Sequence, residues 1–496
     1  MKTKLLLLLV SVALGSTISA ATITVTSNDS IGTGSLKEAV AAATVGDLIV
    51  FEFEAPNNDI LLNNEIAMKS ISMNGINTLN GARVVLKQTT VGKKVFDLAA
   101  GITANVSNLI FDGSAGSTYP NITAALGSTI NIDNCIFRDI NAGSNNGAAV
   151  RIQGAANITN CLFQNNTCVG SYGGPALCIY NGANVVIDKC SFVGNKAGLN
   201  SNGGGGAVVA RGTAVDPCNV KITNSSFVNN ISEKNGGALL ASVQSSTNYT
   251  VNLTAVNCTF TGNQGNGAIS ALTTVKGKAN VYLVNSIVVN NVDAASSAYS
   301  DLLETKGTDA AATAIIEPHN VIYSVASASI VTTDRNCIQV ADPSTATIFN
   351  ALETFATDKK RPVLSTSNGQ TVAMISSTSI AKAAGVATLS PYTIPTVDQL
   401  SETRPATPAI GAVEFKDLGA GFSNLKNENK IQLISKGREI SFLGLSENSE
   451  VRIYGLTGNL LLKSVVRNNQ TIPLKNIREN LVLLKIGSQS FKLLLK

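Results

Sequence analysis

Three charged residues have the types and spacing that could carry chemistry. Asp112 ends one short apolar segment, and Arg138 and Asp139 end the next such segment along the chain. Lysis of a uronic-acid linkage needs a lysine or arginine base, with Ca²⁺ or an arginine to neutralise the carboxylate, and hydrolysis needs two carboxylates about 5–10 Å apart. Arg138, Asp112 and Asp139 are therefore the catalytic candidates if the chain is an enzyme, and a polysaccharide lyase or another carbohydrate-active enzyme is then the best match.

Other charged residues on the same segments are weaker candidates, namely Asp133, Arg151 and Asp188. The simpler interpretation of all these side chains is a solvated outer face. The composition supports that interpretation, because the 496 residues include no tryptophan, one histidine and only 9 tyrosines. A single histidine, His319, cannot fill a catalytic triad or a multi-histidine metal site without partners, so we interpret it as structural. We expect no catalytic residues, no cofactor and no metal, and Ca²⁺ enters only with the lyase alternative.

The eight cysteines have spacings that indicate a repeat. The sequence contains no C-x-x-C pair, so a zinc site has no support. One recurring position holds cysteine or serine: Cys135, Cys161, Cys190, Ser225, Cys258 and Ser286. Buried cysteine behaves as a small hydrophobe, so we favour stacked free thiols at this position. Disulfides among Cys168, Cys178, Cys218 or the stacked set remain the alternative.

That cysteine position belongs to a longer repeat between about residues 100 and 292. A block like Ile158–Phe163 recurs at 132–137, 187–192, 222–227 and 255–260, and a Gly-Gly-Ala block followed by an aliphatic residue precedes most copies. An asparagine follows each phenylalanine position, at Asn166, Asn195, Asn230, Asn263 and Asn291. We expect the amides of the first four to bond from repeat to repeat, and their backbone to be left-handed.

These segments are too short and too rich in glycine for helices, and one repeat cannot bury its own apolar face. Stacked as the rungs of a parallel β-solenoid, about 4.8 Å apart, the repeats bury Ile, Phe and Cys at every rung. Crossovers between parallel strands are right-handed in nearly all proteins. The sequence therefore predicts an all-β, right-handed parallel β-helix of roughly ten rungs, with its charges outside.

The paired F-x-x-N and G-G-A-[ILV] blocks, with cysteine before the phenylalanine, resemble the polymorphic outer membrane protein repeat. The match covers residues 130–292. The opening segment, Gly34–Val40 followed by Gly46–Phe51, resembles the start of secreted bacterial proteins with a pectin-lyase-like β-helix. The resemblance implies an adhesin-like, surface-exposed protein. Independently, Ser35 and Glu38 form a capping-box pattern that predicts an N-terminal helix covering the first rung.

Residues 293–415 lose the repeat period, and we expect them to form the last irregular rungs and a covering segment. Asp342-Pro343 and the stretch that contains Asp398, Arg404 and Ile410–Glu414 resemble the segments that close related β-helices. The glycine that those relatives have after the aspartate is missing after Asp398. The domain boundaries predicted for the chain are a signal peptide at 1–20, the β-helix at 21–416, a linker at 417–429 and a small antiparallel β-sandwich at 430–496.

The C-terminal region 430–496 resembles the sorting domain that the type IX secretion system reads. The matching residues are Val451–Gly458, Ile472–Leu474 and Lys492–Lys496, whereas Glu479–Leu481 depart from the family's G-x-Y. The alternative is an ordinary accessory β-domain. If the resemblance holds, residues 430–496 bind the secretion machinery.

Lys2, Lys4, an apolar run to Leu14 and the small residues that follow predict a secretory signal peptide. No later stretch is long and apolar enough for a membrane span, and a net charge of +5 is too small to indicate nucleic acid as a partner. Together these features predict a protein that is secreted or held at the cell surface or outer membrane of a Gram-negative bacterium. We expect it to be adhesin-like or glycan-contacting and non-catalytic, with an extracellular glycan or a host surface ligand as its partner. The third interpretation is a passive structural rod that binds no ligand.

Overall fold

A computed structural model divides the chain into two compact units, residues 1–415 and 416–496. The structure describes residues 20–54, 58–198, 204–343, 347–356, 359–367, 369–415, 432–436, 439–443, 449–455, 459–467, 470–474, 477, 481–486 and 489–494. The predicted signal peptide, apart from Ala20, and the whole predicted linker therefore lie outside the described residues.

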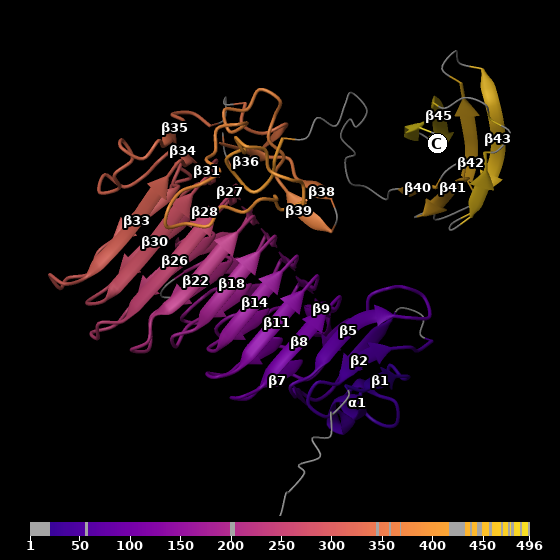
Figure 1. The fold of residues 1–496 in the computed structure, drawn as a ribbon, viewed down its shortest axis with the longest axis horizontal. Coiled ribbons are helices and arrows are strands. Elements are labelled where there is room, and N and C mark those ends of the chain that lie inside the picture. The colour runs from indigo at the N-terminus through magenta and orange to yellow at the C-terminus, as the bar shows by residue number, and fades with distance from the viewer. Residues whose placement is uncertain are drawn as a thin grey trace, which may run out of the picture. The chain divides into compact units, whose positions relative to one another are not determined.

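The first unit is an all-β parallel solenoid of about 10 turns, as the repeat predicted. Three long parallel sheets and one short one run along it, and the arrows of sheet A are seen stacked side by side in Figure 1. Sheet A consists, in stacking order, of β1 (Thr22–Val25), β2 (Leu48–Phe51), β5 (Ser72–Asn77), β8 (Thr103–Ser107), β11 (Thr129–Asp133), β14 (Ala155–Thr159), β18 (Asn184–Asp188), β22 (Cys218–Thr223), β26 (Thr250–Val256), β30 (Lys278–Val284) and β33 (Thr313–His319).

Sheets B, C and D complete each turn. Sheet B consists of β3 (Asp59–Leu62), β6 (Val85–Gln88), β9 (Ile110–Asp112), β12 (Ile136–Arg138), β15 (Leu162–Gln164), β19 (Ser191–Val193), β23 (Ser226–Val228), β27 (Thr259–Thr261), β31 (Ile287–Val289), β34 (Ile322–Tyr323) and β35 (Ile338–Gln339). Sheet C consists of β4 (Ile66–Ala67), β7 (Phe96–Leu98), β10 (Ile122–Ala124), β13 (Val150–Ile152), β17 (Leu177–Ile179), β21 (Val208–Arg211), β25 (Leu239–Val243), β29 (Ile269–Thr273) and β32 (Leu302–Thr305). Sheet D consists of β16 (Thr167–Cys168), β20 (Lys196–Ala197), β24 (Ile231–Asn235) and β28 (Gln264–Asn266).

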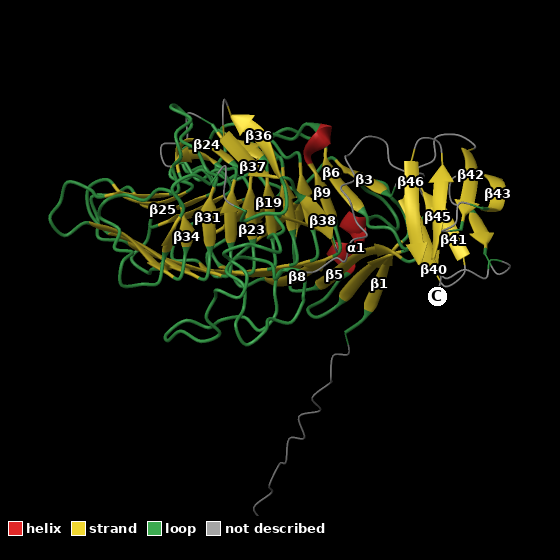
Figure 2. Cartoon of the chain, turned by 90° about the horizontal axis from the view of Figure 1, so that it is seen from above, coloured by secondary structure: helices red, strands yellow, loops and turns green. Residues whose placement is uncertain are grey.

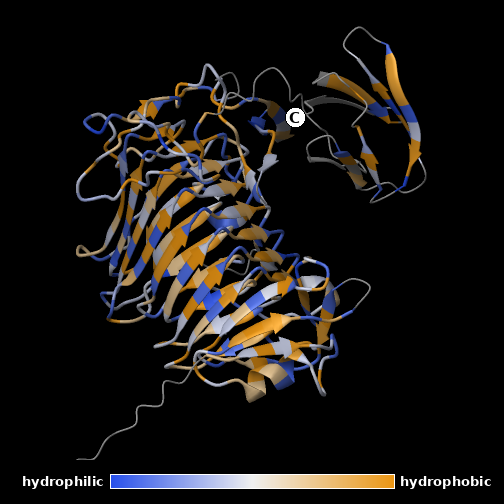
Figure 3. Cartoon of the chain, turned by 45° about the vertical axis from the view of Figure 1, so that its right-hand side comes forward, coloured by the Kyte–Doolittle hydropathy of each residue, from blue (hydrophilic) through white to orange (hydrophobic). Residues whose placement is uncertain are grey.

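The core between these sheets is built from columns of identical side chains. Six phenylalanines form one column, with neighbouring ring centroids 4.4–5.0 Å apart and ring planes within 14° of parallel: Phe111, Phe137, Phe163, Phe192, Phe227 and Phe260. Apolar and polar residues alternate along the strands of sheet A, as Figure 3 shows by colour. The period of two therefore places one set of side chains inside the solenoid and leaves the other outside.

The asparagines after each phenylalanine are buried and bond from rung to rung, as predicted. Each Nδ2 donates to the Oδ1 of the next asparagine at 2.9–3.0 Å and to the carbonyl oxygen of a phenylalanine in the preceding rung at 2.9–3.1 Å, through Asn166, Asn195, Asn230, Asn263 and Asn291. The column ends where Asn291 donates to the buried carboxylate of Asp301 at 2.9 Å. Every amide is thus satisfied inside the core.

The predicted left-handed backbone lies elsewhere. Positive φ angles occur one residue before the column, at Asn165, Gly194, Asn229, Gly262 and Asn290, and in a second series before the cysteine position. The prediction was wrong by one position, because the tight turn falls on the residue that precedes each buried asparagine. Asparagine and glycine tolerate that turn best.

All eight cysteines are free, so the disulfide alternative was wrong. Cys135, Cys161, Cys190 and Cys258 are fully buried at the predicted inward position. The backbone N–H of Cys190 donates to Ser225 Oγ at 3.1 Å, which shows that serine replaces the thiol within the same column. Burial raises the pKa of Cys258 to about 12, so its thiol is unreactive.

The described helices are few and short, as Figure 2 shows: α1 (Leu36–Ala42) and the 3₁₀ turn η1 (Gly113–Ala115). Ser35 Oγ accepts from the Glu38 N–H at 3.3 Å, and the Glu38 carboxylate accepts from the Gly34 N–H at 2.6 Å. The return bond of the expected capping box is thus made to Gly34 instead of Ser35. Leu36 and Val40 are buried in the same core as the first strands.

The last rungs end at β35, and residues 347–415 then fold back over sheet B. We call these residues the covering segment. It contains the hairpins β36 (Leu352–Ala356) with β37 (Lys359–Pro362) and β38 (Ser365–Ser367) with β39 (Gln370–Val372). Its apolar residues, among them Ile348 and Ile410, form one cluster with Ile287 and Ile322 of sheet B. The expected covering segment is therefore confirmed.

The second unit contains two antiparallel sheets among its described residues. One joins β40 (Gln432–Lys436), β41 (Glu439–Leu443) and β44 (Thr471–Pro473), and the other joins β43 (Leu460–Val466), β42 (Ser449–Tyr454), β45 (Leu481–Ile486) and β46 (Gln489–Leu494). Buried residues from both sheets form a single core, with Ile440, Val451 and Leu484 among them. This unit therefore has a hydrophobic core of its own.

Candidate functional site

The structure joins two of the three catalytic candidates in an ion pair. Asp112 and Arg138 are register partners on β9 and β12. Arg138 donates from Nε at 2.9 Å and from Nη2 at 2.7 Å to Asp112 Oδ2. Burial raises the pKa of Asp112, but hydrogen bonds from Ser114 and Arg138 outweigh it and hold the pKa below its usual value. The pair stays charged and mutually satisfied at neutral pH.

Asp139 occupies a turn with φ of 56° and accepts from Asn165 Nδ2 at 3.2 Å. Asp133 and Asp188 likewise accept hydrogen bonds from Thr159 and Thr223 of the neighbouring rung. These carboxylates therefore brace turns. His319 ends β33, with its ring centroid 5.8 Å from that of Tyr392.

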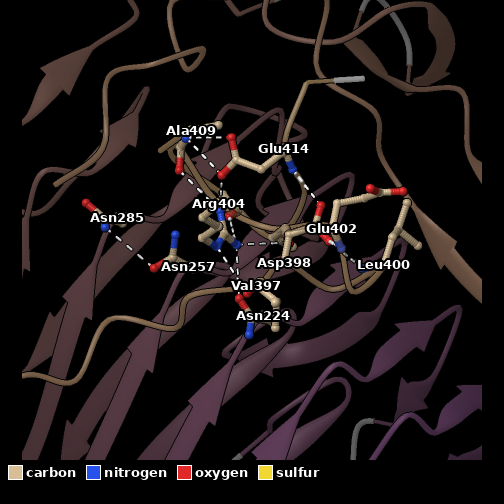
Figure 4. A network of polar contacts seen from close by, with 12 residues as sticks. Asn224, Asn257, Asn285, Val397, Asp398, Leu400, Glu402, Arg404, Ala409 and Glu414 are labelled. Atoms are coloured by element: carbon tan, nitrogen blue, oxygen red, sulfur yellow. Dashed lines mark hydrogen bonds and ion pairs between the residues drawn. The ribbon is translucent and has the colours of Figure 1, made fainter. Parts of the chain in front are cut away.

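The covering segment is tied to the solenoid through Arg404, which Figure 4 shows at the centre of a polar network. Its guanidinium contacts Glu414 Oε1 at 2.5 Å and Asn224 Oδ1 at 3.0 Å. It also donates to the carbonyl oxygens of Val397, Ala409, Gly411 and Ala412. The residues that resembled a closing segment thus form a cross-link in which each guanidinium nitrogen has a partner.

A different arrangement of arginine and tyrosine lies on the outer face of sheet C. We call it the arginine–tyrosine patch, and its residues are Tyr119, Arg151, Tyr172, Tyr180 and Arg211. Tyr172 and Tyr180 pack on buried Cys178, Val209, Leu240 and Leu272. Their rings meet edge to face, with centroids 5.5 Å apart. All five patch residues are partly exposed.

The guanidinium of Arg211 lies over the ring of Tyr172, 4.0 Å from its centroid, and that of Arg151 lies 5.7 Å from the centroid of Tyr119. Both distances permit a cation–π interaction. The position of the residues follows from the register. Tyr180 directly follows β17, and Arg211 is the last residue of β21. These two strands pair in sequence, and Arg151 lies one strand before them on β13.

Neither patch arginine forms an ion pair within the described part of the chain. Arg151 Nε and Arg211 Nη1 are buried and find no hydrogen-bond acceptor there. The undescribed residues 199–203, nearest to Arg211 along the chain, contain no aspartate or glutamate. Burial lowers the pKa of Arg211, a shift too small to remove the charge of a guanidinium. Within the described residues, neither patch arginine therefore has a carboxylate at ion-pair distance.

One carboxylate does face Arg151 from the same sheet. Asp97 on β7 is bound by Lys94 at 2.8 Å and by the hydroxyl of Thr123. Burial raises the pKa of Asp97, but these two bonds, with a smaller contribution from Arg151, lower it overall. Lys94 already pairs with Asp97. The charges of Arg151 and Arg211 are therefore not compensated by this carboxylate.

Sequence reasoning named Arg151 only as a weak candidate and missed the rest of the patch. A signal was present: Gln153, Tyr180 and Arg211 stand at the same distance after successive copies of the Gly-Gly-Ala block. The two loop tyrosines carry no such signal, because only the folded loops bring them onto the sheet.

The comparisons with known proteins add no family. No protein-family model matches the sequence, and no curated protein matches it. Within the described residues, no group of three or more histidine, cysteine, aspartate or glutamate side chains could hold a metal ion. The described helices include none with the length and apolar character needed to cross a membrane.

Proposed function

We propose that this chain is an exported, surface-associated or secreted solenoid that contacts an extracellular glycan or a host surface ligand without cleaving it. The observation that carries the proposal is the arginine–tyrosine patch. Partly exposed tyrosine rings offer apolar surface to the C–H faces of sugars, and neighbouring guanidiniums offer hydrogen-bond donors to their oxygens. The adhesin-type repeat is consistent with such a role.

The geometry of Asp112 and Arg138 favours binding over the lyase alternative. A lyase base must accept a proton from the substrate, and an arginine engaged by a carboxylate stays protonated. Asp139 is held in a turn, where its carboxylate accepts from Asn165. These residues are therefore assigned to the stability of the rungs.

The proposal includes the route to the cell surface. The signal peptide at 1–20 would start export, and residues 430–496 would bind the type IX secretion machinery of a Gram-negative bacterium. Support comes from the residues Val451–Tyr454 and Ile472–Pro473, which match the sorting domain and form parts of β42 and β44. A right-handed winding, a capping role for α1 and a sandwich arrangement of the second unit belong to the same proposal.

Binding and turnover are tested together with a panel of soluble polysaccharides. We expect retardation of the purified protein in gels that contain a bound polysaccharide, with no new reducing ends and no ultraviolet-absorbing unsaturated product. Product release would overturn the non-catalytic assignment. No retardation by any glycan would overturn glycan contact.

Export is tested separately by deleting residues 430–496. We expect the solenoid to remain folded, as judged by its β-type circular dichroism, and to disappear from the cell-surface fraction. Unchanged surface fractionation of the folded truncation would overturn the sorting role.

A further inference from the structure

We infer that the arginine–tyrosine patch selects acidic glycans, with Arg151 and Arg211 binding the carboxylate or sulfate groups of the chain. This inference rests on the proposed function and names the ligand class of the same site. It starts from the two guanidiniums that have no carboxylate partner among the described residues, while their Nε and Nη1 atoms are buried without acceptors. An incompletely compensated charge is costly in the free protein and favours an anionic ligand.

The surroundings of the guanidiniums restrict that ligand further. Tyr172 and Tyr180 stand on a floor of buried Val209 and Leu240, so the patch also offers apolar surface beside its charge. A free inorganic anion would use only the charge. A sugar acid uses both, because its ring carries C–H groups on one face and an anionic group at the edge.

The spacing of the patch fits a polymer. Arg151 lies on β13 and Arg211 ends β21, with β17 between them. Neighbouring strands are about 4.8 Å apart, so the two arginines belong to strands about 10 Å apart. That span accommodates a disaccharide, so that one chain crossing the rungs can present an acidic group to each arginine.

The tyrosines hold the guanidiniums ready for this contact. With its guanidinium carbon 4.0 Å from the Tyr172 centroid, Arg211 is in contact with the ring, which restricts its side chain before a ligand binds. The backbone N–H of Tyr172 in turn donates to Asn146 Oδ1 at 2.8 Å, which fixes the loop that carries the ring. Tyr172 is therefore a positioning residue as well as a contact surface.

The experiment compares pairs of ligands that differ only in charge, using calorimetry on the intact protein. One pair is an oligogalacturonate and its methyl ester, and the other is a sulfated dextran oligosaccharide and plain dextran. We expect the acidic member of at least one pair to bind at least about tenfold more tightly, the value for losing one hydrogen-bonded charge contact. Binding in the first pair identifies a carboxylate, and binding in the second pair a sulfate.

The variants Arg151→Gln and Arg211→Gln should each weaken acidic binding by about tenfold or more, and Tyr172→Leu should weaken it while keeping the loop packed. Arg83→Gln is the matched control, because Arg83 donates to Asn134 Oδ1 at 2.6 Å, away from sheet C.

Equal binding of the acidic and neutral ligands by the unaltered protein would overturn the inference and leave glycan contact standing. Acidic binding that survives both arginine substitutions would overturn the assignment to this patch. If no glycan binds at all, it is the proposed function itself that fails.

Discussion

Two arginines on the outside of the solenoid differ in how their charge is compensated. Arg404, from the covering segment over sheet B, faces the carboxylate of Glu414 at 2.5 Å, an asparagine amide and four carbonyl oxygens. Arg211, on sheet C, lies over a tyrosine ring with one buried nitrogen that finds no acceptor among the described residues. A guanidinium whose donors are all used ties two parts of the protein together. One without a carboxylate partner keeps a positive charge that an anionic ligand can compensate.

Removing the saturated arginine should have the largest effect on stability. We expect Arg404→Met to lower the free energy of unfolding by about 3–5 kcal/mol, because it removes a buried guanidinium from its network and leaves the largely covered Glu414 carboxylate without its cation. Denaturant unfolding measures the loss, and limited proteolysis should cut residues 347–415 first. The control is Arg361→Met, which breaks the more exposed pair with Glu353 and should cost under about 1 kcal/mol. Equal losses of stability in the two variants would mean that the many hydrogen-bond partners of Arg404 add nothing to the stability that a single exposed ion pair gives.

A buried carboxylate, Asp301, forms no ion pair in the part of the chain that the structure describes, and it tests the same rule with the opposite charge. Burial raises the pKa of Asp301 to about 6, while hydrogen bonds from Ser324, Asn291 and Val325 pull it down. Because the folded protein holds this proton more tightly than the unfolded chain, stability should fall as the pH rises from about 4 to about 6, by up to about 3 kcal/mol. Denaturation midpoints across this range, compared between the unaltered protein and Asp301→Asn, should show that contribution only in the former. A parallel pH dependence in the variant would contradict it.

An alanine in place of a glycine tests how the loop that carries Tyr172 is packed. Gly173 has a φ of 79°, and an added Cβ would lie 1.8 Å from the carbonyl oxygen of Gly204. We expect Gly173→Ala to cost about 2 kcal/mol or more and to disturb the loop that carries Tyr172. Gly92→Ala is the control, since its φ is 77° but nothing lies within 4 Å of the added atom. Thermal unfolding that ranks the two alike would show that strain at φ, and not the contact with Gly204, sets the cost.

The smallest effect on stability is expected at the patch arginine itself. Arg211→Gln should change the free energy of unfolding by no more than about 1 kcal/mol, because it removes no ion pair found in the described structure and the lost cation–π contact is offset by removal of an uncompensated charge. The same denaturant titration used for Arg404→Met measures this. A loss as large as that of the Arg404 variant would show that Arg211 is a structural residue, and the comparison between the two arginines would collapse.

The sequence predicted the regular part of this protein well, because repetition exposes it. Every rung that repeats Phe192 or Asn195 must bury the same atoms, so the parallel solenoid, the phenylalanine column and the amide column could all be predicted. The left-handed turns were misplaced by one residue, since in three of the five rungs asparagine occupies both positions and only the backbone distinguishes them. Periodicity alone does not say which of two adjacent asparagines turns.

The candidate site was predictable only in part. The repeat spacing predicted that Asp112 and Arg138 lie side by side. It did not predict that they form an ion pair with each other. The patch was missed because Tyr119 and Tyr172 come from loops outside the repeat, and because a count of tyrosines over the whole chain hides their local concentration. Residues that recur in every rung indicate the fold, whereas residues that depart from the repeat at one rung can indicate a binding site.

The asparagine column also gives the rod a direction. Every amide donates forward to the next rung, and the last donor, on Asn291, meets the carboxylate of Asp301. In a chain that folds from its N-terminal end, each new rung supplies the oxygen that the previous amide lacks, so the growing end always carries one unmet donor inside the core. An unmet donor at the growing end of the solenoid favours the addition of the next rung. The aspartate then ends the asparagine column with an acceptor, and its second carboxylate oxygen accepts from Ser324 and Val325, so the last rung joins by a different contact.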